Sequence, residues 1–367
     1  MENNNINIQQ SSIEIQEIPM YSKDEAYINN CKNNISIKKF GLKKKPIENY
    51  IQPPSSFTLT FDEIPIKFNK IFPANISEFY RKGKIILVGT RHFSNQSRND
   101  VRDVIRSTIP DAIFVELCHS RINILNMNEE VIVDDILNPL ELIFNCIKQE
   151  GLTKGLVSAL LISYTNELMK KSKLCPGGEF RVAQEEGRKI KNSIFGFCDR
   201  NIEITLNRLY RQLTFWEKLK LLKDILYFNN DDERVKKLFD NTSNYINFDD
   251  FPLLSWEHFP SFKKIMVDER DQYMSTFLLE KYNKIFEEKA KVSIEEEKSM
   301  EAVNIVAVVG YGHISGIKNY FGKEYDLNDL NSISTSNEKK EPLKLGLQIF
   351  VIGGVLLITH YVFKRWM

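Results

Sequence analysis

Two short apolar segments, residues 84–88 and 111–116, most constrain what this chain of 367 residues can fold into. Apolar runs of this length, bounded by glycine or proline, are typical of β-strands that are buried on both faces of a sheet. Residues 94–105 lie between them and combine a polar start with apolar positions at helical spacing. A strand, a helix and a strand within about thirty residues form a βαβ unit, so the sequence predicts two parallel strands.

Later segments extend this pattern. Strands are predicted at residues 193–198 and 304–309, and helices at residues 152–169, 206–226 and 268–286. The uncharged part of the first helix is too short to span a bilayer, so we expect it to be buried in the domain. The sequence therefore predicts an α/β fold that combines a central sheet containing parallel βαβ elements with a large helical middle section.

The composition changes along the chain and predicts three parts before the hydrophobic C-terminal segment, namely a leader, a domain and a linker. Residues 1–54 are rich in Asn, Ile, Gln and Lys without a sustained period, and we expect a disordered leader there. Residues 55–328 form the predicted α/β domain, and residues 329–344 read as a polar linker. Positive and negative charges nearly balance at a net charge of +1, so no electrostatic argument favours nucleic acid as a partner.

The five cysteines are odd in number and show no C-x-x-C spacing. This usage fits a reducing compartment and does not predict a disulfide framework or a zinc ribbon.

Residues 345–363 form a hydrophobic segment of about 19 residues without a formal charge. As a helix at ~1.5 Å per residue it would reach ~28 Å, close to the ~30 Å hydrocarbon core of a bilayer. Lys344 precedes the segment, and Lys364, Arg365 and Trp366 follow it, as is typical of membrane interfaces. We expect a C-terminal transmembrane tail anchor rather than a buried core helix.

The N-terminal residues MENNNINIQQ lack the basic and apolar regions of a secretory signal. We therefore expect the bulk of the protein to lie in the cytosol, with the membrane as a partner through the C-terminal helix. Basic residues after a short anchor resemble those of mitochondrial outer-membrane proteins, and the endoplasmic reticulum is the alternative location.

Two similar turns occur far apart in the sequence. Residues 85–88 lead into Gly89-Thr-Arg-His92, and residues 305–309 lead into Gly310-Tyr-Gly-His313. Each places a histidine three residues after a glycine at the end of a strand. If the two strands are neighbours, both imidazoles face one crevice at the carboxyl ends of the sheet, where α/β folds bind ligands. Two histidines and a carboxylate suit a divalent metal, whereas a histidine that merely packs in its turn is the alternative.

The sequence lacks the common nucleotide-binding motifs and the nucleophile elbow of serine hydrolases. The sequence contains no G-x-x-x-x-G-K-[ST] loop and no G-x-S-x-G elbow, and the glycine spacing of residues 310–316 does not match a dinucleotide fingerprint. We therefore expect no nucleotide cofactor.

Five blocks of sequence resemble the TraB domain family. They are ILVGTRHFSNQSRNDVRDVIRSTIPDAIFVELCHSR, GGEFRVAQEEGRK, DRNIEITLNR, DERDQYM and VAVVGYGHISGI, which occur in the order of the family and cover about residues 83–318. The family includes a bacterial pheromone-shutdown protein, Tiki-type membrane proteases that cleave Wnt, and intracellular tail-anchored members. This chain looks most like the last group.

The resemblance to Tiki-type proteases implies a metal-dependent, peptidase-like hydrolase with an unidentified divalent metal. His92 and His313 match the histidines of its two G-x-x-H motifs, and Glu116 matches its acidic residue. Glu179 is a second candidate for a catalytic carboxylate. A salt bridge from Glu116 to an arginine, and a helix-dipole role for Glu179, are the structural alternatives. Arg91, where the family commonly has a small residue, places a positive charge beside His92 that opposes a bound cation.

Three arginines in the family blocks are candidates for substrate binding. Arg200, Arg208 and Arg270 suit a substrate carboxylate or phosphate, because a guanidinium binds both in a bidentate manner. Pairing of these arginines with acidic residues inside the protein, such as Glu269 or Asp271, is the alternative that we favour. The function is accordingly predicted as a membrane-anchored hydrolase acting on a cytosol-facing substrate, with an unknown peptide or protein partner. A non-catalytic regulator or tether of organelle organisation is the alternative.

Overall fold

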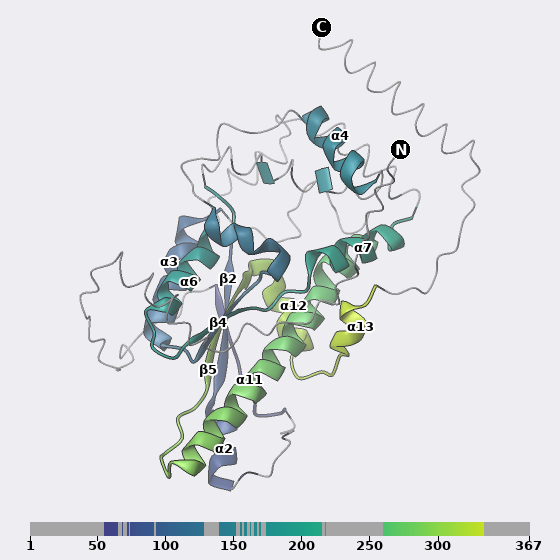
Figure 1. Cartoon of the computed structure of the whole chain (residues 1–367). Coiled ribbons are helices and arrows are strands. Elements are labelled where there is room, and N and C mark those ends of the chain that lie inside the picture. Colours follow the sequence, from purple (N-terminus) through teal and green to yellow (C-terminus); the bar gives the residue numbers. More distant parts are fainter. Residues whose placement is uncertain are drawn as a thin grey trace, which may run out of the picture.

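A computed structural model describes residues 55–64, 74–91, 93–127, 139–151, 174–214 and 260–333 of the chain. It also describes the single residues 68, 72, 155, 158, 159, 162, 165, 166, 169 and 217. These parts form a five-stranded sheet in the order β1-β2-β5-β3-β4, with helices on both faces (Figure 1). The α/β fold class predicted from the sequence is confirmed.

Four strands of the sheet are parallel, as predicted. They are β2 (Lys84–Thr90), β3 (Ala112–Val115), β4 (Ile194–Phe197) and β5 (Asn304–Gly310). The fifth strand, β1 (Ser56–Leu59), pairs with β2 in the antiparallel direction, so the sheet is mixed. The sequence did not predict β1, because its four residues, SFTL, give too short an alternation to be recognised.

Each face of the sheet has its own hydrophobic core, because successive residues of a strand point to opposite sides. Ile86 and Val88 of β2 pack with α3 (Asn95–Thr108) and α6 (Gly178–Arg188) on one face. Ile85 and Leu87 pack on the other face with three further helices. Those helices are α2 (Ala74–Lys82), α11 (Glu269–Glu295) and α12 (Ile314–Tyr320). The sheet is therefore the middle of three layers.

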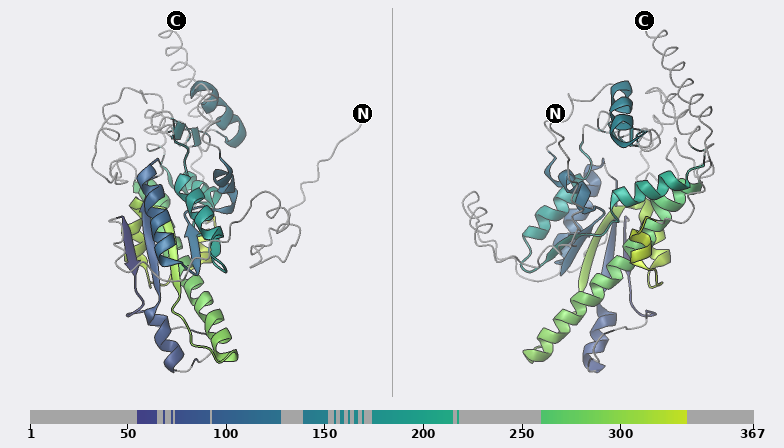
Figure 2. Two further views of the ribbon diagram at one scale, coloured as in Figure 1. Left: turned by 90° about the vertical axis from the view of Figure 1, so that its left-hand side faces the viewer. Right: turned by 45° about the vertical axis from the view of Figure 1, so that its right-hand side comes forward.

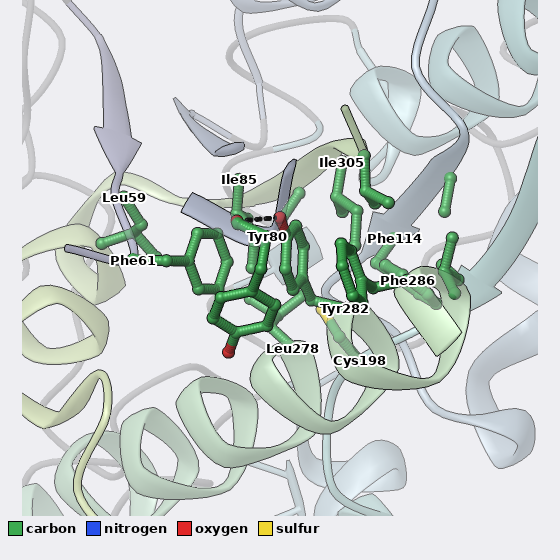
Figure 3. Close-up of a cluster of buried hydrophobic side chains, with 14 of the residues drawn as sticks. Leu59, Phe61, Tyr80, Ile85, Phe114, Cys198, Leu278, Tyr282, Phe286 and Ile305 are labelled. Carbon is green, nitrogen blue, oxygen red and sulfur yellow. Dashed lines mark hydrogen bonds between the residues drawn. The ribbon is translucent and has the colours of Figure 1, made fainter. Parts of the chain in front are cut away.

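An aromatic cluster fixes the long helix α11 to the sheet (Figure 3). The ring of Tyr282 stacks on Phe61 with centroids 3.8 Å apart, and its hydroxyl donates a 2.6 Å hydrogen bond to the carbonyl oxygen of Tyr80. Tyr80 also packs edge-on against Phe286. Beyond this cluster, α11 and α2 continue past the lower end of the sheet in Figures 1 and 2. The N-terminal end of α11 is thereby held at the opposite end of the sheet, where the parallel strands have their carboxyl ends.

Shorter helices complete the described part of the chain. They are η1 (His119–Asn126), α4 (Pro139–Glu150), α7 (Ile202–Gln212), α10 (Pro260–Lys263), the π-helical turn η3 (Lys264–Asp268), η4 (Tyr311–His313) and α13 (Leu327–Asn331).

The single helix predicted over residues 206–226 is wrong, since α7 ends at Gln212 and Leu213 is extended. The reason is a capping box, in which a threonine and a glutamate three residues later satisfy each other's backbone at the start of a helix. Thr214 and Glu217 form these contacts, because the Thr214 N–H donates to the Glu217 carboxylate (2.7 Å) and the Glu217 N–H donates to Thr214 Oγ1 (3.3 Å). Thr214 therefore caps a separate helical turn, to which the described residue Glu217 belongs.

The ends of the chain were predicted to be a leader, a linker and an anchor. Residues 1–54 and 345–363 lie outside the described residues, so the predicted leader and anchor stay predictions. Within the described ranges, no helix is both long and apolar enough to cross a bilayer. Helix α13 crosses the boundary predicted between residues 328 and 329, and Arg208 donates a hydrogen bond to the carbonyl oxygen of Ser332.

Candidate functional site

The two G-x-x-H turns start side by side. Strand β2 pairs directly with β5, and their last partners are Thr90 and Gly310, so the two strands end at the same level of the sheet. The neighbouring strands on which the metal-site prediction depended are therefore confirmed. His92 itself lies outside the described residues, whereas His313 lies within them.

His313 is buried between two carboxylates. It ends η4, at the start of α12, and is 0% exposed. Its Nδ1 lies 2.5 Å from Asp271 Oδ1 in the first turn of α11, and its Nε2 lies 3.2 Å from Glu116 Oε1. The first contact fixes the orientation of the ring. The second is an ion-pair contact without hydrogen-bond geometry, and it places a carboxylate near Nε2 at the carboxyl ends of the strands.

Glu116 joins three elements at the ends of the strands. It directly follows β3, and its Oε2 accepts a 2.6 Å hydrogen bond from the Gly310 N–H at the end of β5. Its Oε1 accepts a hydrogen bond from Arg270 Nη2 as well as facing His313. The salt bridge to an arginine and the position beside the histidine, posed as alternatives from the sequence, occur together.

Arg270 is the buried cation between the carboxylates. Its Nε and Nη2 donate to the two oxygens of Asp199 at 3.0 and 2.9 Å, and its Nη1 donates to the carbonyl oxygen of Met266 at 3.0 Å. Met266 belongs to the π-helical turn η3, and such turns are frequent at functional sites. We call Glu116, Asp199, Arg270, Asp271 and His313 the strand-end cluster.

The electrostatics of the strand-end cluster favour a bound proton. Burial opposes the imidazolium of His313, but Glu116 and Asp271 outweigh it and raise its pKa to about 9, even against Arg270. Burial also raises the pKa of Asp271. The pKa of Arg270 is raised as well, since Asp199 and Glu116 outweigh the effect of its burial. Three carboxylates thus face an arginine and a protonated histidine, with Arg121 donating to Asp199 from outside at 2.7 Å.

Arg200 and Arg208 pair with Glu269, which was the favoured alternative to substrate binding. Arg200 is completely buried and donates to Glu269 (2.9 Å) and to the carbonyl oxygen of Leu330 (3.1 Å). Arg208 donates to both oxygens of Glu269 and to the carbonyl oxygen of Ser332. These contacts hold α13 against the start of α11. The substrate-binding role of the three arginines stays a prediction, and the contacts shown join groups of the protein itself.

Glu179 lies in the first turn of α6 and is 1% exposed. The helix begins after Gly177, whose φ of 73° suits glycine, and the guanidinium of Arg98 packs closely on Gly178. A carboxylate at this position stabilises the helix through its dipole, as the structural alternative proposed. A catalytic role for Glu179 stays a prediction.

The fit of a metal to these residues is partial. A histidine that binds a metal usually has its other ring nitrogen on a carboxylate, and His313 has this arrangement through Asp271. Its Nε2 and Glu116 Oε1 supply two donors on the same side. Within the described ranges, however, no three His, Cys, Asp or Glu side chains are grouped so that they could hold a metal ion. A metal centre therefore requires a donor from outside these ranges, and His92 is the predicted one.

Sequence reasoning missed two members of the strand-end cluster, Asp199 and Asp271, as site residues. Asp199 stands two residues after the end of β4, so the rule that sites lie at the carboxyl ends of parallel strands was sufficient to find it. Asp271 lies 42 residues before His313 in the chain, and only the packing of α11 against α12 brings the two together.

Comparisons with known proteins match most of this domain. Residues 76–323 match the TraB/PrgY/gumN family. A human TraB domain-containing protein is 30% identical over 279 residues, which are 74% of this chain and 71% of the human protein. The mouse TraB domain-containing protein is 30% identical over 68% of this chain and 66% of its own length. An uncharacterized protein of Methanocaldococcus jannaschii is 31% identical over 76% of this chain and 64% of its own length.

Proposed function

Because the chain belongs to the TraB/PrgY/gumN family, we propose that it is a metal-dependent hydrolase of peptidase type, centred on the strand-end cluster. The observation that supports this proposal most is the geometry of His313, which is held by Asp271 through Nδ1 and directs Nε2 towards Glu116. These groups gather at the carboxyl ends of the parallel strands, which is where α/β enzymes place their chemistry. The peptidase type follows from the resemblance to Tiki-type proteases.

Each residue of the proposed centre has a role. His313 Nε2, Glu116 Oε1 and the predicted ligand His92 would hold a divalent cation. When bound, such a cation lowers the pKa of a water molecule and polarises a substrate carbonyl. Asp271 keeps the Nδ1 proton of His313 in place, and Glu116 or Glu179 would act as the general base towards water. Arg270 neutralises part of the negative charge and fixes Glu116.

The bound proton of His313 makes metal binding depend on pH. With a pKa of about 9, the imidazole is protonated at neutral pH, and its Nε2, which lies 3.2 Å from Glu116 Oε1, carries a proton. A cation at Nε2 must displace this proton, so binding releases a proton and the affinity rises with pH.

One observation favours the alternative function, a non-catalytic regulator or tether. Arg270 Nη2 already donates to Glu116 Oε1, the oxygen that faces His313. The guanidinium of Arg270 therefore compensates the charge of the Glu116 carboxylate, so the charges are balanced without a bound metal ion. Under this alternative the strand-end cluster is a structural core of the domain.

The location is proposed from the sequence. Residues 345–363 are proposed to anchor the domain in a membrane, preferably the mitochondrial outer membrane, with the endoplasmic reticulum as the alternative. The domain would then face a cytosolic peptide or protein substrate. No nucleic acid and no nucleotide cofactor is part of the proposal.

A peptide-library digestion distinguishes the two functions. The full-length protein, first treated with a chelator, is incubated with the library after addition of Zn²⁺, Mn²⁺ or Co²⁺, and mass spectrometry identifies new peptide termini. A hydrolase produces new termini with at least one metal, and the His313→Ala and Glu116→Gln variants produce none. His119→Ala is the matched control, because His119 is exposed on η1 and should leave cleavage unchanged.

Two results would contradict the hydrolase. New termini that persist in both variants would come from a contaminating enzyme, and no new termini with any of the three metals would favour the regulator.

A further inference from the structure

Gly316 lies where the carboxylate of Asp271 approaches α12. A Cβ atom built on Gly316 would clash with Asp271 Oδ2, and it would lie 2.5 Å from Asp271 Cγ and 3.0 Å from Asp271 Cβ. The same carboxylate holds His313 through its other oxygen, Oδ1. The absence of a side chain at Gly316 therefore leaves the space that the Asp271 carboxylate fills.

The backbone of Gly316 does not itself require a glycine. Gly316 lies inside the helix α12, and it is not among the glycines with positive φ. Alanine is the better helix former at such a position, because glycine loses more conformational freedom on folding. Backbone geometry thus gives no reason for a glycine here, whereas the space occupied by Asp271 does.

Asp271 has little freedom to move away from a larger residue. Its Cβ is fixed by the backbone of α11, so rotation of the side chain cannot relieve the 3.0 Å contact with a new methyl group. The aromatic cluster around Tyr282 holds the same helix on the sheet. A side chain at position 316 must therefore displace the carboxylate, the helix or both.

We propose that Gly316 is a positioning residue for His313, which acts by seating the Asp271 carboxylate against the imidazole. Gly316 follows His313 by three residues, and residues at this spacing share one face of a helix. The imidazole of His313 and the space beside Gly316, which the Asp271 carboxylate fills, therefore both face α11. Through Nδ1, the seated carboxylate determines which way Nε2 points, and Nε2 faces Glu116.

This inference deepens the proposed function, because the histidine that Gly316 positions is the proposed metal ligand. The geometry on which it stands involves only protein groups, so it can be tested without a metal. The first test is a double-mutant cycle in the full-length protein, with thermal unfolding as the measurement. Gly316→Ala should lower the Tm when Asp271 is present, and it should lower the Tm clearly less in an Asp271→Ala background, where the carboxylate is gone and only the 3.0 Å contact with Cβ remains.

Ser315→Ala is the matched control, since Ser315 is the exposed neighbour on the same helix and its substitution should be neutral in both backgrounds. Should Gly316→Ala alone fail to fold, recovery of folded protein in the double variant with Asp271→Ala supports the proposal. An equal decrease of Tm in both backgrounds, or no recovery of folding, overturns it.

A second measurement reports the histidine directly. A short hydrogen bond between Nδ1 and a carboxylate moves the imidazole N–H resonance strongly downfield in the proton NMR spectrum. This resonance should be present in the wild type and in Ser315→Ala, and absent from Asp271→Ala and Gly316→Ala. Its persistence in Gly316→Ala would overturn the proposal.

Metal binding separates this inference from the proposed function. If the wild type binds a metal through His313, Gly316→Ala should weaken the affinity by ~10–100-fold, as loss of an outer partner of a ligand does. If the wild type binds none, the proposed function fails, while the Tm cycle and the NMR resonance still decide the role of Gly316. Unchanged affinity in Gly316→Ala, beside a loss in His313→Ala, would overturn the inference and leave the function intact.

Discussion

Two ion-pair networks of this domain use the same chemical groups in different surroundings. The strand-end cluster lies in the interior, where the side chains of Arg270 and His313 are 7% and 1% exposed. The second network, which we call the α3–α6 bridge, joins Arg106 and Lys189 to Glu186. Its carboxylate is buried, but its Arg106 and Lys189 side chains are 55% and 45% exposed.

The two networks differ in how much charge they remove from water. In the α3–α6 bridge, burial opposes the charge of Glu186, but hydrogen bonds from Arg106 and Lys189 outweigh it and lower the pKa of Glu186. Water solvates the far ends of these cations, so little charge is desolvated. In the strand-end cluster every charge is removed from water and must be compensated by an opposite charge. Apolar residues of similar volume would fill the same space at a lower cost in free energy. A buried cluster of titratable groups with shifted pKa values is typical of a functional centre.

The largest expected effect is the loss of stability on removal of the central arginine of the strand-end cluster. Arg270→Met should destabilise the domain by about 3–5 kcal/mol, because Glu116 and Asp199 then remain buried without their shared cation. Urea unfolding monitored by circular dichroism measures this difference. A loss below about 1 kcal/mol would show that the cluster is more hydrated than its burial indicates.

The second effect is a decrease of stability with rising pH, centred on His313. Its folded pKa is raised from 6.5 to about 9, so the stabilisation is fully present below pH 6.5 and is lost as the pH rises through 9. The loss is on the order of 3 kcal/mol at most, since one pKa unit corresponds to about 1.4 kcal/mol. Unfolding of the chelator-treated protein between pH 6 and 10 measures it.

The control for this effect is the His313→Gln variant, which keeps a polar side chain that does not titrate in this range. Its stability should change less with pH than that of the wild type. Equal slopes in both proteins would assign the pH dependence to other groups.

The smallest effect belongs to the α3–α6 bridge. Arg106→Met should destabilise the domain by roughly 1 kcal/mol or less, because Glu186 keeps Lys189 and the removed cation is largely exposed. The difference should shrink further at high salt, since screening weakens exposed pairs more than buried ones. Salt titration of the unfolding midpoint compares this variant with Arg270→Met, whose loss should hardly depend on salt. A salt-independent loss in Arg106→Met would remove the contrast between the networks.

The sequence was sufficient for much of the fold, and the parts that it missed have physical reasons. Strands β2 and β5 were recognised because each is a continuous apolar run followed by a glycine, whereas their adjacency was only the condition on which the metal site was predicted. The short edge strand β1 lacks such a run. The break after Gln212 depended on Thr214 and Glu217, whose capping box interrupts an apolar stripe that looks continuous.

The candidate site was predictable to a smaller extent. His313 and Glu116 stand at strand ends, where one local rule selects them. Their partners Asp271 and Arg270 come from the start of α11, so their place in the strand-end cluster depends on packing between distant elements. The pairing of Arg200 with Glu269 was foreseen only as one of two choices, because a guanidinium binds an internal carboxylate as readily as a substrate.

The most direct test of a shared metal centre at the two G-x-x-H turns is a double-mutant cycle on metal affinity. Isothermal titration with Zn²⁺ and Co²⁺ compares the full-length wild type with His92→Ala, His313→Ala and the double variant. If both histidines hold one cation, each single variant loses most of the affinity and the double variant binds little more weakly than either. Unchanged affinity in His313→Ala, or losses that simply add, would contradict a shared metal centre.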